Sequence, residues 1–328
     1  MIELTLATWD HDRCIALHQG QVTVPGVKLD SCIHPPSKLF PWAVQEARFD
    51  ITEMSVSSYV LQLSRGGSDY TAIPAFVSRA FRHSGFFARA GSGITSPSDF
   101  AGRRIGVPEY QMTAALWMRG ILADEYGVDC SAIHWCTGAL DAGIRRERLE
   151  LVLPIGMVVE PIKDGDTLQD MLLRGDIDGL LAPKPPQAFL DGNPALVRLF
   201  PDFETAEQAY FRKTGFFPIM HIIGLRKTLA AEHPWLARGL YDGFVEARDL
   251  ALKRLRDVWL GNANRLSLPW LGASMERTLA ALGPDYWSYG FNNNRAEIDA
   301  ICRYSTDQHL AATRVKPETL FHSSVLDT

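Results

Sequence analysis

Hydrophobic and polar residues alternate along the chain in a way that predicts strands leading directly into helices. Residues 2–8 alternate as in a strand, residues 22–32 resemble a second strand with a Pro-Gly turn, and residues 36–49 favour a helix. Further short strands are expected at residues 50–54, 71–76, 104–107, 133–136 and 177–182, and further helices at residues 167–175, 234–260, 273–282 and 294–312. Between residues 100 and 183 the alternation of helices and strands is typical of a parallel α/β sheet.

The stretch FAGRRIGVPEYQMTAALWMRGILADEYGV (100–128) is the clearest unit, with a turn, a short strand, a corner at Pro108 and a long helix that Gly127 ends. A strand that runs into a helix N-terminus leaves backbone N–H groups free, and these groups attract anions. The polar residues at this corner are Glu109, Tyr110, Gln111 and Thr113. They indicate either an anion-binding site or an ordinary junction in which Thr113 caps the helix.

Polar residues also follow three other predicted strands, where open α/β sheets bind their ligands. They are Asp10, His11 and Asp12 after residue 8, Ser55, Ser57 and Ser58 after residue 54, and Ser78, Arg79, Arg82 and His83 after residue 76. Each group also has a structural interpretation, as a solvated loop, a helix cap or ordinary surface arginines. Residues 207–221 are expected to form an unusually aromatic and basic loop that ends in His221.

Composition narrows the classes of function. The 328 residues, 46% hydrophobic and 22% charged, are typical of a globular protein with one large or two medium domains. A net charge of −5 without a basic block gives no indication of nucleic-acid binding, and no apolar run has membrane-spanning length. Five scattered cysteines favour a reducing compartment, and the first residues lack the layout of a signal peptide, so a cytoplasmic protein is expected.

Motifs for common cofactors are missing from the sequence. It contains no GxGxxG or GxxxxGK[ST] phosphate loop, no HExxH and no GxSxG, and its histidines do not have metal-chelating spacing. We therefore expect neither a metal nor a cofactor. His11, His83 and His221 each lie at or near a predicted strand end, which gives them more weight than the other histidines. The charged run at residues 145–148 is interpreted as a solvated face.

Several segments resemble known proteins. DFAGRRIGVP (99–108), LQDMLLRGDIDGL (168–180) and HPWLARGLYDGF (233–244) resemble the type II periplasmic-binding-protein fold, in motifs that many transport receptors carry. More specifically, four segments resemble the 4,5-dihydroxyphthalate decarboxylase family: TEMSVSSY (52–59), IPAFVSRAFRHS (73–84), IGVPEYQMTAALWMRGILADEYGV (105–128) and YFRKTGFFPIMH (210–221). This similarity runs over nearly the whole chain, and the blocks EYQMTAA, FRHS and FPIMH are its most specific part.

The resemblance implies an α/β fold of two lobes, each a mixed, mostly parallel sheet flanked by helices, joined by two hinge strands. Lobe 1 is expected to comprise residues 1–88 and 222–328, and lobe 2 residues 89–221, with the ligand in the cleft between them. The hinge crossings are expected near residues 85–89 and 218–225. The polar strand ends described above would then line this cleft.

The implied activity, part of phthalate degradation, is cofactor-independent decarboxylation of 4,5-dihydroxyphthalate, or a similar hydroxylated aromatic carboxylate, to protocatechuate and CO2. Each ring hydroxyl is para to a carboxylate, so the ring can accept the electrons itself. His221 or His11 is the expected proton donor, and Glu109 or Asp10 could accept the phenol proton. The expected substrate-binding residues are Thr8, Asp10, Ser55, Arg79, Arg82, Tyr110, Gln111, Thr113 and Arg212, with Arg79 and Arg82 as a carboxylate clamp.

Two alternatives remain open, because a fold of this kind does not imply catalysis. One is a solute-binding protein for an aromatic or dicarboxylic acid in an ABC-type uptake system. The other is a ligand-sensing or biosynthetic relative that acts on a different ring acid. The expected partner in each case is a small aromatic acid, without nucleic acid or membrane, and the sequence leaves a homo-oligomer open.

Overall fold

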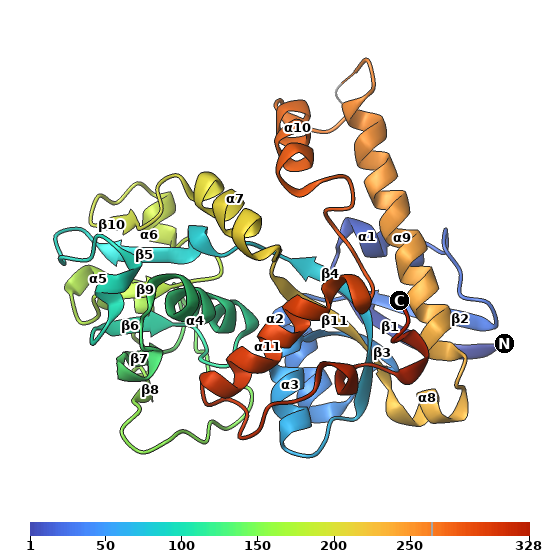
Figure 1. Ribbon diagram of the computed structural model, residues 1–328, viewed down its shortest axis with the longest axis horizontal. Helices are drawn as coiled ribbons and strands as arrows, with labels where there is room; N and C mark the ends of the chain where they lie inside the picture. Colours follow the sequence, from blue (N-terminus) through green and yellow to red (C-terminus); the bar gives the residue numbers. More distant parts are fainter. Residues whose placement is uncertain (264) are drawn as a thin grey trace.

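Two β-sheets lie side by side in the computed structural model, which describes residues 1–263 and 265–328 (Figure 1). The first sheet has the strand order β2 (Val27–Ile33), β1 (Ile2–Thr8), β3 (Ile51–Ser55), β11 (Ile219–Arg226) and β4 (Tyr70–Arg79). Strand β1 is parallel to β2 and β3, whereas β11 is antiparallel to both β3 and β4. The expected second strand at residues 22–32 therefore begins only at Val27, after its Pro-Gly turn.

The second sheet has the order β10 (Leu196–Arg198), β5 (Phe86–Arg89), β9 (Gly179–Leu181), β6 (Arg104–Val107), β7 (His134–Thr137) and β8 (Val159–Pro161). Strands β9, β6, β7 and β8 are mutually parallel, and β5 is antiparallel to β9 and β10. The two three-residue strands β8 and β10 were not among the predicted elements, because so few residues show no clear period. Both sheets are thus mixed.

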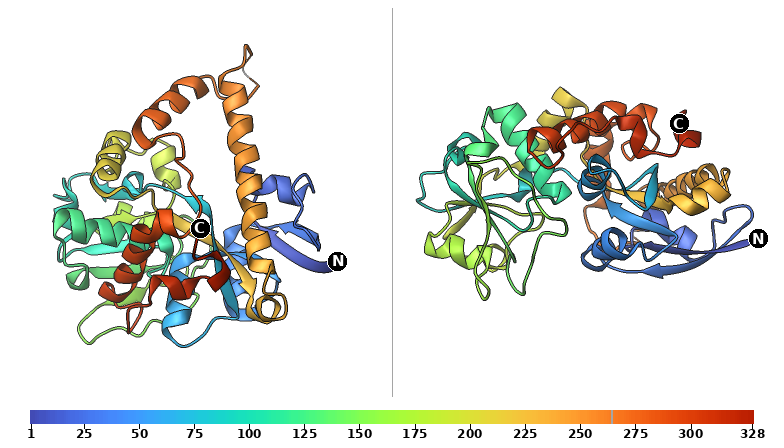
Figure 2. Two further views of the ribbon diagram at one scale, coloured as in Figure 1. Left: turned by 45° about the vertical axis from the view of Figure 1, so that its right-hand side comes forward. Right: turned by 90° about the horizontal axis from the view of Figure 1, so that it is seen from below.

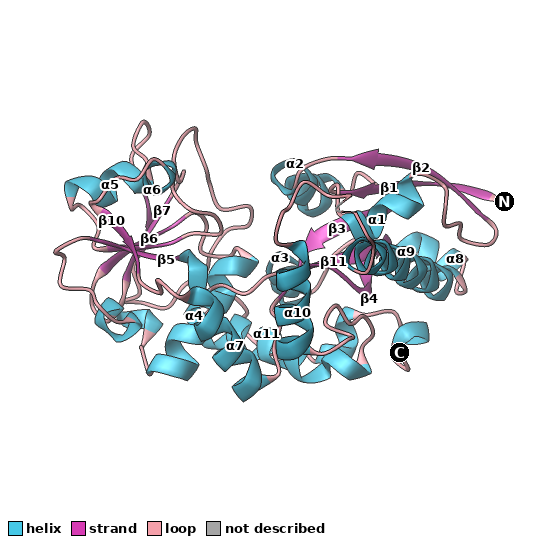
Figure 3. Ribbon diagram, turned by 90° about the horizontal axis from the view of Figure 1, so that it is seen from above, coloured by secondary structure: helices cyan, strands magenta, loops and turns pink. Residues whose placement is uncertain are grey.

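Helices flank both sheets (Figure 3). They are α1 (Asp12–His18), α2 (Pro36–Pro41), α3 (Val56–Ser64), α4 (Thr113–Tyr126), α5 (Leu168–Arg174), α6 (Gln187–Leu190), α7 (Phe203–Thr214), α8 (Lys227–Glu232), α9 (Leu236–Trp259), α10 (Leu271–Leu282) and α11 (Arg295–Asp307). Helix α7 covers most of residues 207–221, so the prediction of a loop there was wrong; Asp202 caps this helix and Gly215 ends it. None of the described helices combines the length and the hydropathy needed to cross a membrane.

The chain passes between the sheets twice. It leaves the first sheet after Arg79 at the end of β4 and enters the second at Phe86, and it returns between the end of α7 and Ile219. Gly85, at the first crossing, lies so close to the second lobe that a Cβ atom on Gly85 would be 2.4 Å from the carbonyl oxygen of Ala182. The expected lobe limits, 88/89 and 221/222, fall inside β5 and β11, a few residues beyond the observed crossings.

The C-terminal helix α11 packs against α4 of the second lobe and α3 of the first (Figures 1 and 2). Tyr304 of α11 packs against Gly120 of α4 so closely that a Cβ atom on Gly120 would be 2.5 Å from the Tyr304 ring. The centroids of the Tyr304 and Trp117 rings are 5.5 Å apart. Gln308 accepts a hydrogen bond from the buried Arg119 at 2.7 Å. The C-terminal segment, expected wholly in lobe 1, therefore holds the two lobes together on one side.

Candidate active site

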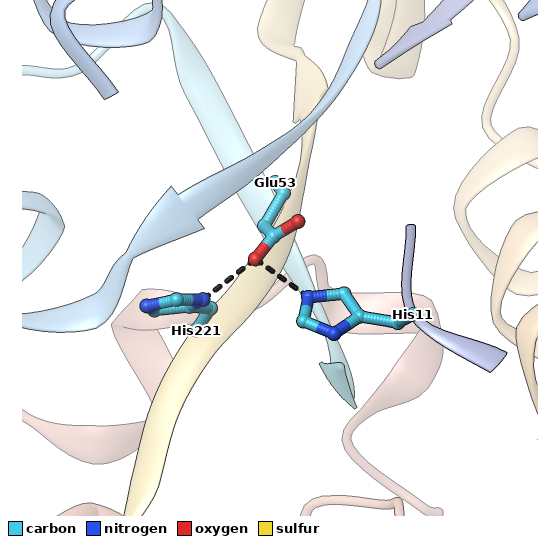
Figure 4. Close-up of side chains that lie close together, drawn as sticks. All are labelled: His11, Glu53 and His221. Carbon is cyan, nitrogen blue, oxygen red and sulfur yellow. Dashed lines mark hydrogen bonds and ion pairs between the residues drawn. The ribbon is translucent and has the colours of Figure 1, made fainter. Parts of the chain in front are cut away.

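A buried carboxylate, Glu53, lies at the centre of the candidate site. It is the third residue of β3, a central strand whose five residues are all buried. Its carboxylate accepts a hydrogen bond from the backbone N–H of Trp9 at 2.7 Å. The same side chain lies 3.0 Å from Nε2 of His11 and 2.6 Å from Nδ1 of His221 (Figure 4). Burial alone would raise the pKa of Glu53, but the hydrogen bonds from the two histidines lower it below its usual range, so this group is ionised.

Strand register explains why these three side chains meet. Strands β1 and β3 are parallel, with Ala7 beside Thr52, so the residues that follow β1 lie next to Glu53. Strand β11 is antiparallel to β3 and pairs His221 with Ser55, which makes His221 a diagonal neighbour of Glu53 on the same face of the sheet. A charged residue in a central strand is costly unless it is paired, and these neighbours supply the partners.

Hydrogen bonds determine the tautomers of the two histidines. Arg13 donates from Nη2 to Nδ1 of His11 at 3.1 Å, so the ring proton of His11 is on Nε2 and is donated to Glu53. His221 donates from Nδ1 to Glu53, and its Nε2 forms no hydrogen bond within residues 1–263 and 265–328. Burial lowers the pKa of His221, and the hydrogen bond that His221 donates to Glu53 opposes this shift. In the protein without a bound ligand, His221 is therefore a neutral imidazole with a lone pair on Nε2.

The ligand atoms of His11, Glu53 and His221 lie within 4.8 Å of one another, close enough to hold a metal ion. Two histidines and a carboxylate are also a common metal-binding set. However, a guanidinium group only donates hydrogen bonds, so Arg13 leaves Nε2 of His11 protonated and unable to bind a metal. This donor set fits a hydrogen-bonded cluster better than a metal centre. The ligand atoms of His134, Cys136 and Glu160 lie equally close together. There the guanidinium of Arg104 is 3.4 Å from the Glu160 carboxylate.

One arginine of the second lobe, Arg148, reaches the site through Phe40. The Phe40 ring of α2 packs edge-on against His221, with 4.7 Å between ring centroids, and the guanidinium of Arg148 lies 5.2 Å from the Phe40 centroid. Arg148 and Arg145 each donate to one oxygen of the buried Glu109 at 2.6 Å. Both oxygens of Glu109 are thus engaged by arginines, which leaves it poorly placed to accept a phenol proton. The interpretation of residues 145–148 as a solvated face was wrong for Arg148, whose side chain is 8% exposed.

The corner before α4, which was interpreted either as an anion-binding site or as an ordinary junction, binds a carboxylate of the protein itself. Glu147 accepts hydrogen bonds from the backbone N–H groups of Tyr110 and of Gln111, the latter at 3.2 Å. Burial raises the pKa of Glu147, while these two hydrogen bonds oppose the shift. The Tyr110 hydroxyl donates to the carbonyl of Gln308 at 3.2 Å, and the Gln111 amide donates to that of Leu149 at 3.1 Å. Both side chains therefore bind their own chain.

Thr113 and Ser55 meet where the two lobes touch. Their hydroxyl oxygens are 2.9 Å apart, and Thr113 Oγ1 also accepts the backbone N–H of Ser57 at 3.2 Å. Thr113 is the first residue of α4, whose N-cap position is Met112, so Thr113 caps α3 of the other lobe rather than its own helix. The N-termini of α3 and α4 are thus brought together near the site.

The two predicted clamp arginines have different surroundings. Arg79 is buried and donates to the carbonyls of Phe217 at 2.7 Å and Ser288 at 2.9 Å, to the Asn294 amide, and to Glu297 at 3.1 Å. These groups belong to the protein, and they leave Arg79 few donors for a substrate. Arg82 has weaker partners, and burial lowers its pKa to about 10.

Arg82 lies beside the strand that carries His221. Its Nε is 3.2 Å from the sulfur of Met220, the residue before His221, and its Nη1 is 3.4 Å from the carbonyl of Pro183. Arg82 is therefore the better placed of the two arginines to meet an anionic ligand.

Three further predicted substrate-binding residues form no hydrogen bond with Glu53 in the part of the chain that the structure describes. Asp10 and Arg212 are exposed, Arg212 in the last turn of α7. Thr8 is buried, with its hydroxyl 2.8 Å from Nε2 of His18 and 2.7 Å from the carbonyl oxygen of Trp9. Thr8 follows Ala7, which pairs with Thr52, so it lies beside Glu53 in the sheet, but its hydroxyl is engaged by His18 and by the backbone.

Comparison with known proteins identifies the family, although no protein-family model matches the chain. A 4,5-dihydroxyphthalate decarboxylase from Comamonas testosteroni is 38% identical over 327 residues, which cover 100% of this chain and 98% of the relative. The chain belongs to the 4,5-dihydroxyphthalate decarboxylase family. A second decarboxylase of this name, from Pseudomonas putida, is 35% identical over 215 residues, covering 66% of this chain and 83% of the relative.

Solved structures confirm the predicted fold for this decarboxylase family member. The periplasmic aliphatic sulphonate binding protein SsuA from Escherichia coli matches with a TM-score of 0.54 and 10% identity over 97% of this chain and 91% of its own. The sulfonate-binding protein SsuA from Methylobacillus flagellatus KT matches with a TM-score of 0.57 and 9% identity, over 98% and 91% of the two chains. Two mixed sheets flanked by helices are thus a periplasmic-binding-protein-like fold.

Sequence reasoning did not single out Glu53, Phe40, Glu147 or Arg148. For Glu53 a signal existed, because it is a carboxylate inside a short strand that the pattern predicted to be buried, within the TEMSVSSY segment shared with the decarboxylase family. A buried charge of this kind needs partners. For Arg148 and Glu147 no local signal separates them from the exposed Arg146.

Proposed function

We propose that the chain is a carboxy-lyase that decarboxylates 4,5-dihydroxyphthalate, or a closely similar hydroxylated aromatic carboxylate, to protocatechuate and CO2. Membership of the decarboxylase family supports the reaction class and the aromatic substrate. The observation that carries the chemistry is the pair His221–Glu53. A buried carboxylate holds one nitrogen of the imidazole at 2.6 Å and leaves the other nitrogen without a partner in the described structure.

The reaction needs one proton and no external electrons. Each ring hydroxyl is para to a carboxylate, so its oxygen can push electron density to the carbon that carries the leaving group. A general acid protonates that carbon, the carbon–carbon bond to the carboxylate breaks, and its electron pair restores the aromatic ring as CO2 departs. The product keeps the second carboxylate, and the acid regains its proton from solvent.

His221 is the proton donor in this proposal. Its pKa is lowered in the free protein, but the negative charges of a bound dicarboxylate favour the imidazolium form, so substrate binding draws a proton onto Nε2. The Nδ1–H of His221 stays on Glu53, whose carboxylate stabilises the imidazolium and orients the ring. His11 has both nitrogens engaged and acts by orienting Glu53.

The anionic groups of the substrate need donors near His221. Arg82, beside Met220, supplies a guanidinium with weak partners in the free protein. The N-termini of α3 and α4 supply a positive electrostatic potential from their backbone N–H groups. None of these steps uses a metal or an organic cofactor, and the five free cysteines support a reducing, cytoplasmic location.

A solute-binding role is the second candidate, because sulfonate-binding proteins share the fold. The test is to mix purified protein with 4,5-dihydroxyphthalate and to follow CO2 release and catechol absorbance. A receptor would bind the compound without turnover. The enzyme should release CO2 catalytically, and His221→Asn should lower kcat by about two to four orders of magnitude while calorimetric binding changes little. His134→Asn, on a half-exposed strand residue of the second lobe, is the matched control.

A further inference from the structure

Arg148 is a buried cation with an unused donor. Its side chain is 8% exposed, its Nε donates to Glu109 at 2.6 Å, and its Nη1 has no hydrogen-bond partner within residues 1–263 and 265–328. Buried guanidinium donors are normally paired, because an unpaired one loses its hydration without compensation. An unused donor of this kind is therefore suited to a ligand that carries an acceptor oxygen.

The position of Arg148 points to a particular group of the ligand. Phe40 contacts both the His221 ring, at 4.7 Å, and the Arg148 guanidinium, at 5.2 Å. Imidazole and guanidinium therefore adjoin the same aromatic side chain. The two carboxylates of a phthalate are on neighbouring ring carbons, so a ring placed with one of these carbons at His221 presents the other carboxylate a short distance away.

Neighbouring residues hold Arg148 in this place. Glu109 is buried and receives one arginine on each carboxylate oxygen, Arg145 and Arg148. Glu147 lies in the same segment, residues 145–148, and accepts hydrogen bonds from the backbone N–H groups of Tyr110 and Gln111. These bonds attach the segment to the corner before α4. The segment comes from the second lobe, whereas His221 belongs to the sheet of the first, so the two groups come together only when the lobes meet.

From this arrangement we infer that Arg148 binds the carboxylate that the substrate retains, with Nη1 as the donor and Glu109 as its positioning partner. The inference rests on the proposed function for the identity of the substrate, and it deepens that function by assigning one of the two carboxylates. A carboxylate gripped by a guanidinium stays in place, whereas the carboxylate beside His221 departs as CO2. Arg148 thereby orients the ring.

The test compares two ligands that differ only in this carboxylate. Protocatechuate keeps it and catechol lacks it, so Arg148→Ala should weaken protocatechuate binding by about 10- to 100-fold and leave catechol binding unchanged. Both dissociation constants are measured by calorimetry on the full chain. Arg146→Ala is the matched control, because Arg146 is in the same segment but is exposed and pairs with the exposed Asp164. It should bind both ligands as the wild type does.

Other outcomes separate the two proposals. If wild-type protein releases no CO2 from 4,5-dihydroxyphthalate, the proposed function fails, and the binding experiment still decides the role of Arg148. Equal affinity of wild type and Arg148→Ala for protocatechuate, or an equal loss for both ligands, overturns the inference. Arg148→Lys keeps the charge beside Glu109 and serves if the alanine variant does not fold. It should still lose several-fold in protocatechuate affinity, and unchanged affinity in that variant would refute the assignment.

Discussion

Replacing Glu53 by glutamine is the most informative single change, because it preserves shape and removes one buried charge. The wild-type carboxylate accepts from His221 at 2.6 Å, from His11 at 3.0 Å and from the backbone of Trp9 at 2.7 Å. A glutamine side chain has one acceptor oxygen and an NH2 group that must face at least one of these donors. A buried donor left without a partner costs about 1–3 kcal/mol, so Glu53→Gln should destabilise the fold by about this amount.

The same change acts on catalysis through His221. A hydrogen bond to a charged group contributes about 1.5–3 kcal/mol, and the lost carboxylate no longer stabilises the imidazolium. Because about 1.4 kcal/mol corresponds to a factor of ten, kcat should fall about 10- to 100-fold at neutral pH. The pKa of His221 should fall further, since burial then acts without the opposing carboxylate, and the alkaline decline of kcat should move to lower pH.

The assay is a pH–rate profile of CO2 release for wild type and Glu53→Gln, with chemical denaturation of both. Glu3→Gln is the control, because Glu3 is exposed and pairs with the exposed Lys28. A Glu53→Gln variant with the wild-type kcat and the wild-type pH profile would refute the role of Glu53. A loss of stability with unchanged kinetics would reduce Glu53 to a structural residue.

Three further predictions concern other parts of the molecule. Arg79→Ala leaves Glu297 buried without its cation and should lower the free energy of unfolding by about 3–5 kcal/mol; an unchanged denaturation midpoint with a raised KM would instead restore Arg79 as a substrate clamp. Decarboxylation should survive exhaustive chelation, since Arg13 keeps His11 protonated toward Glu53, and recovery of lost activity by one divalent ion would contradict this. Burial raises the pKa of Glu207 to about 7, so the folded state binds its proton more tightly than the unfolded state. The free energy of unfolding should therefore decline as pH rises from about 4.5 to about 7. Melting temperatures measured over this pH range should show the decline, and Glu207→Gln should remove the contribution of Glu207 to it.

Local patterns were enough to predict much of the scaffold. The unit at residues 100–128 appears as β6 and α4, with Gly127 in the left-handed conformation that ends the helix. Both observations depend on neighbouring residues only, through hydrophobic period and backbone preference. The polar strand end that contains His11 was also predicted, and the structure brings it to His221, which lies inside β11 rather than at the end of a loop. Their catalytic roles stay a prediction.

Pairing between distant residues was decided only by the tertiary structure. Glu53 meets His221 across 168 positions, because β11 returns to the first sheet and aligns with β3. Arg79 is held by Glu297, 218 positions away, which turns an expected substrate clamp into part of the packing between β4 and α11.

The same reason separates Arg146, whose side chain is exposed, from Arg148, whose side chain is 8% exposed and lies against Phe40. Hydrophobic period reports which face of an element is buried, and that information is local in the chain. The partner of a buried charge depends on strand order and on how the lobes meet, and no stretch of the sequence by itself contains that information.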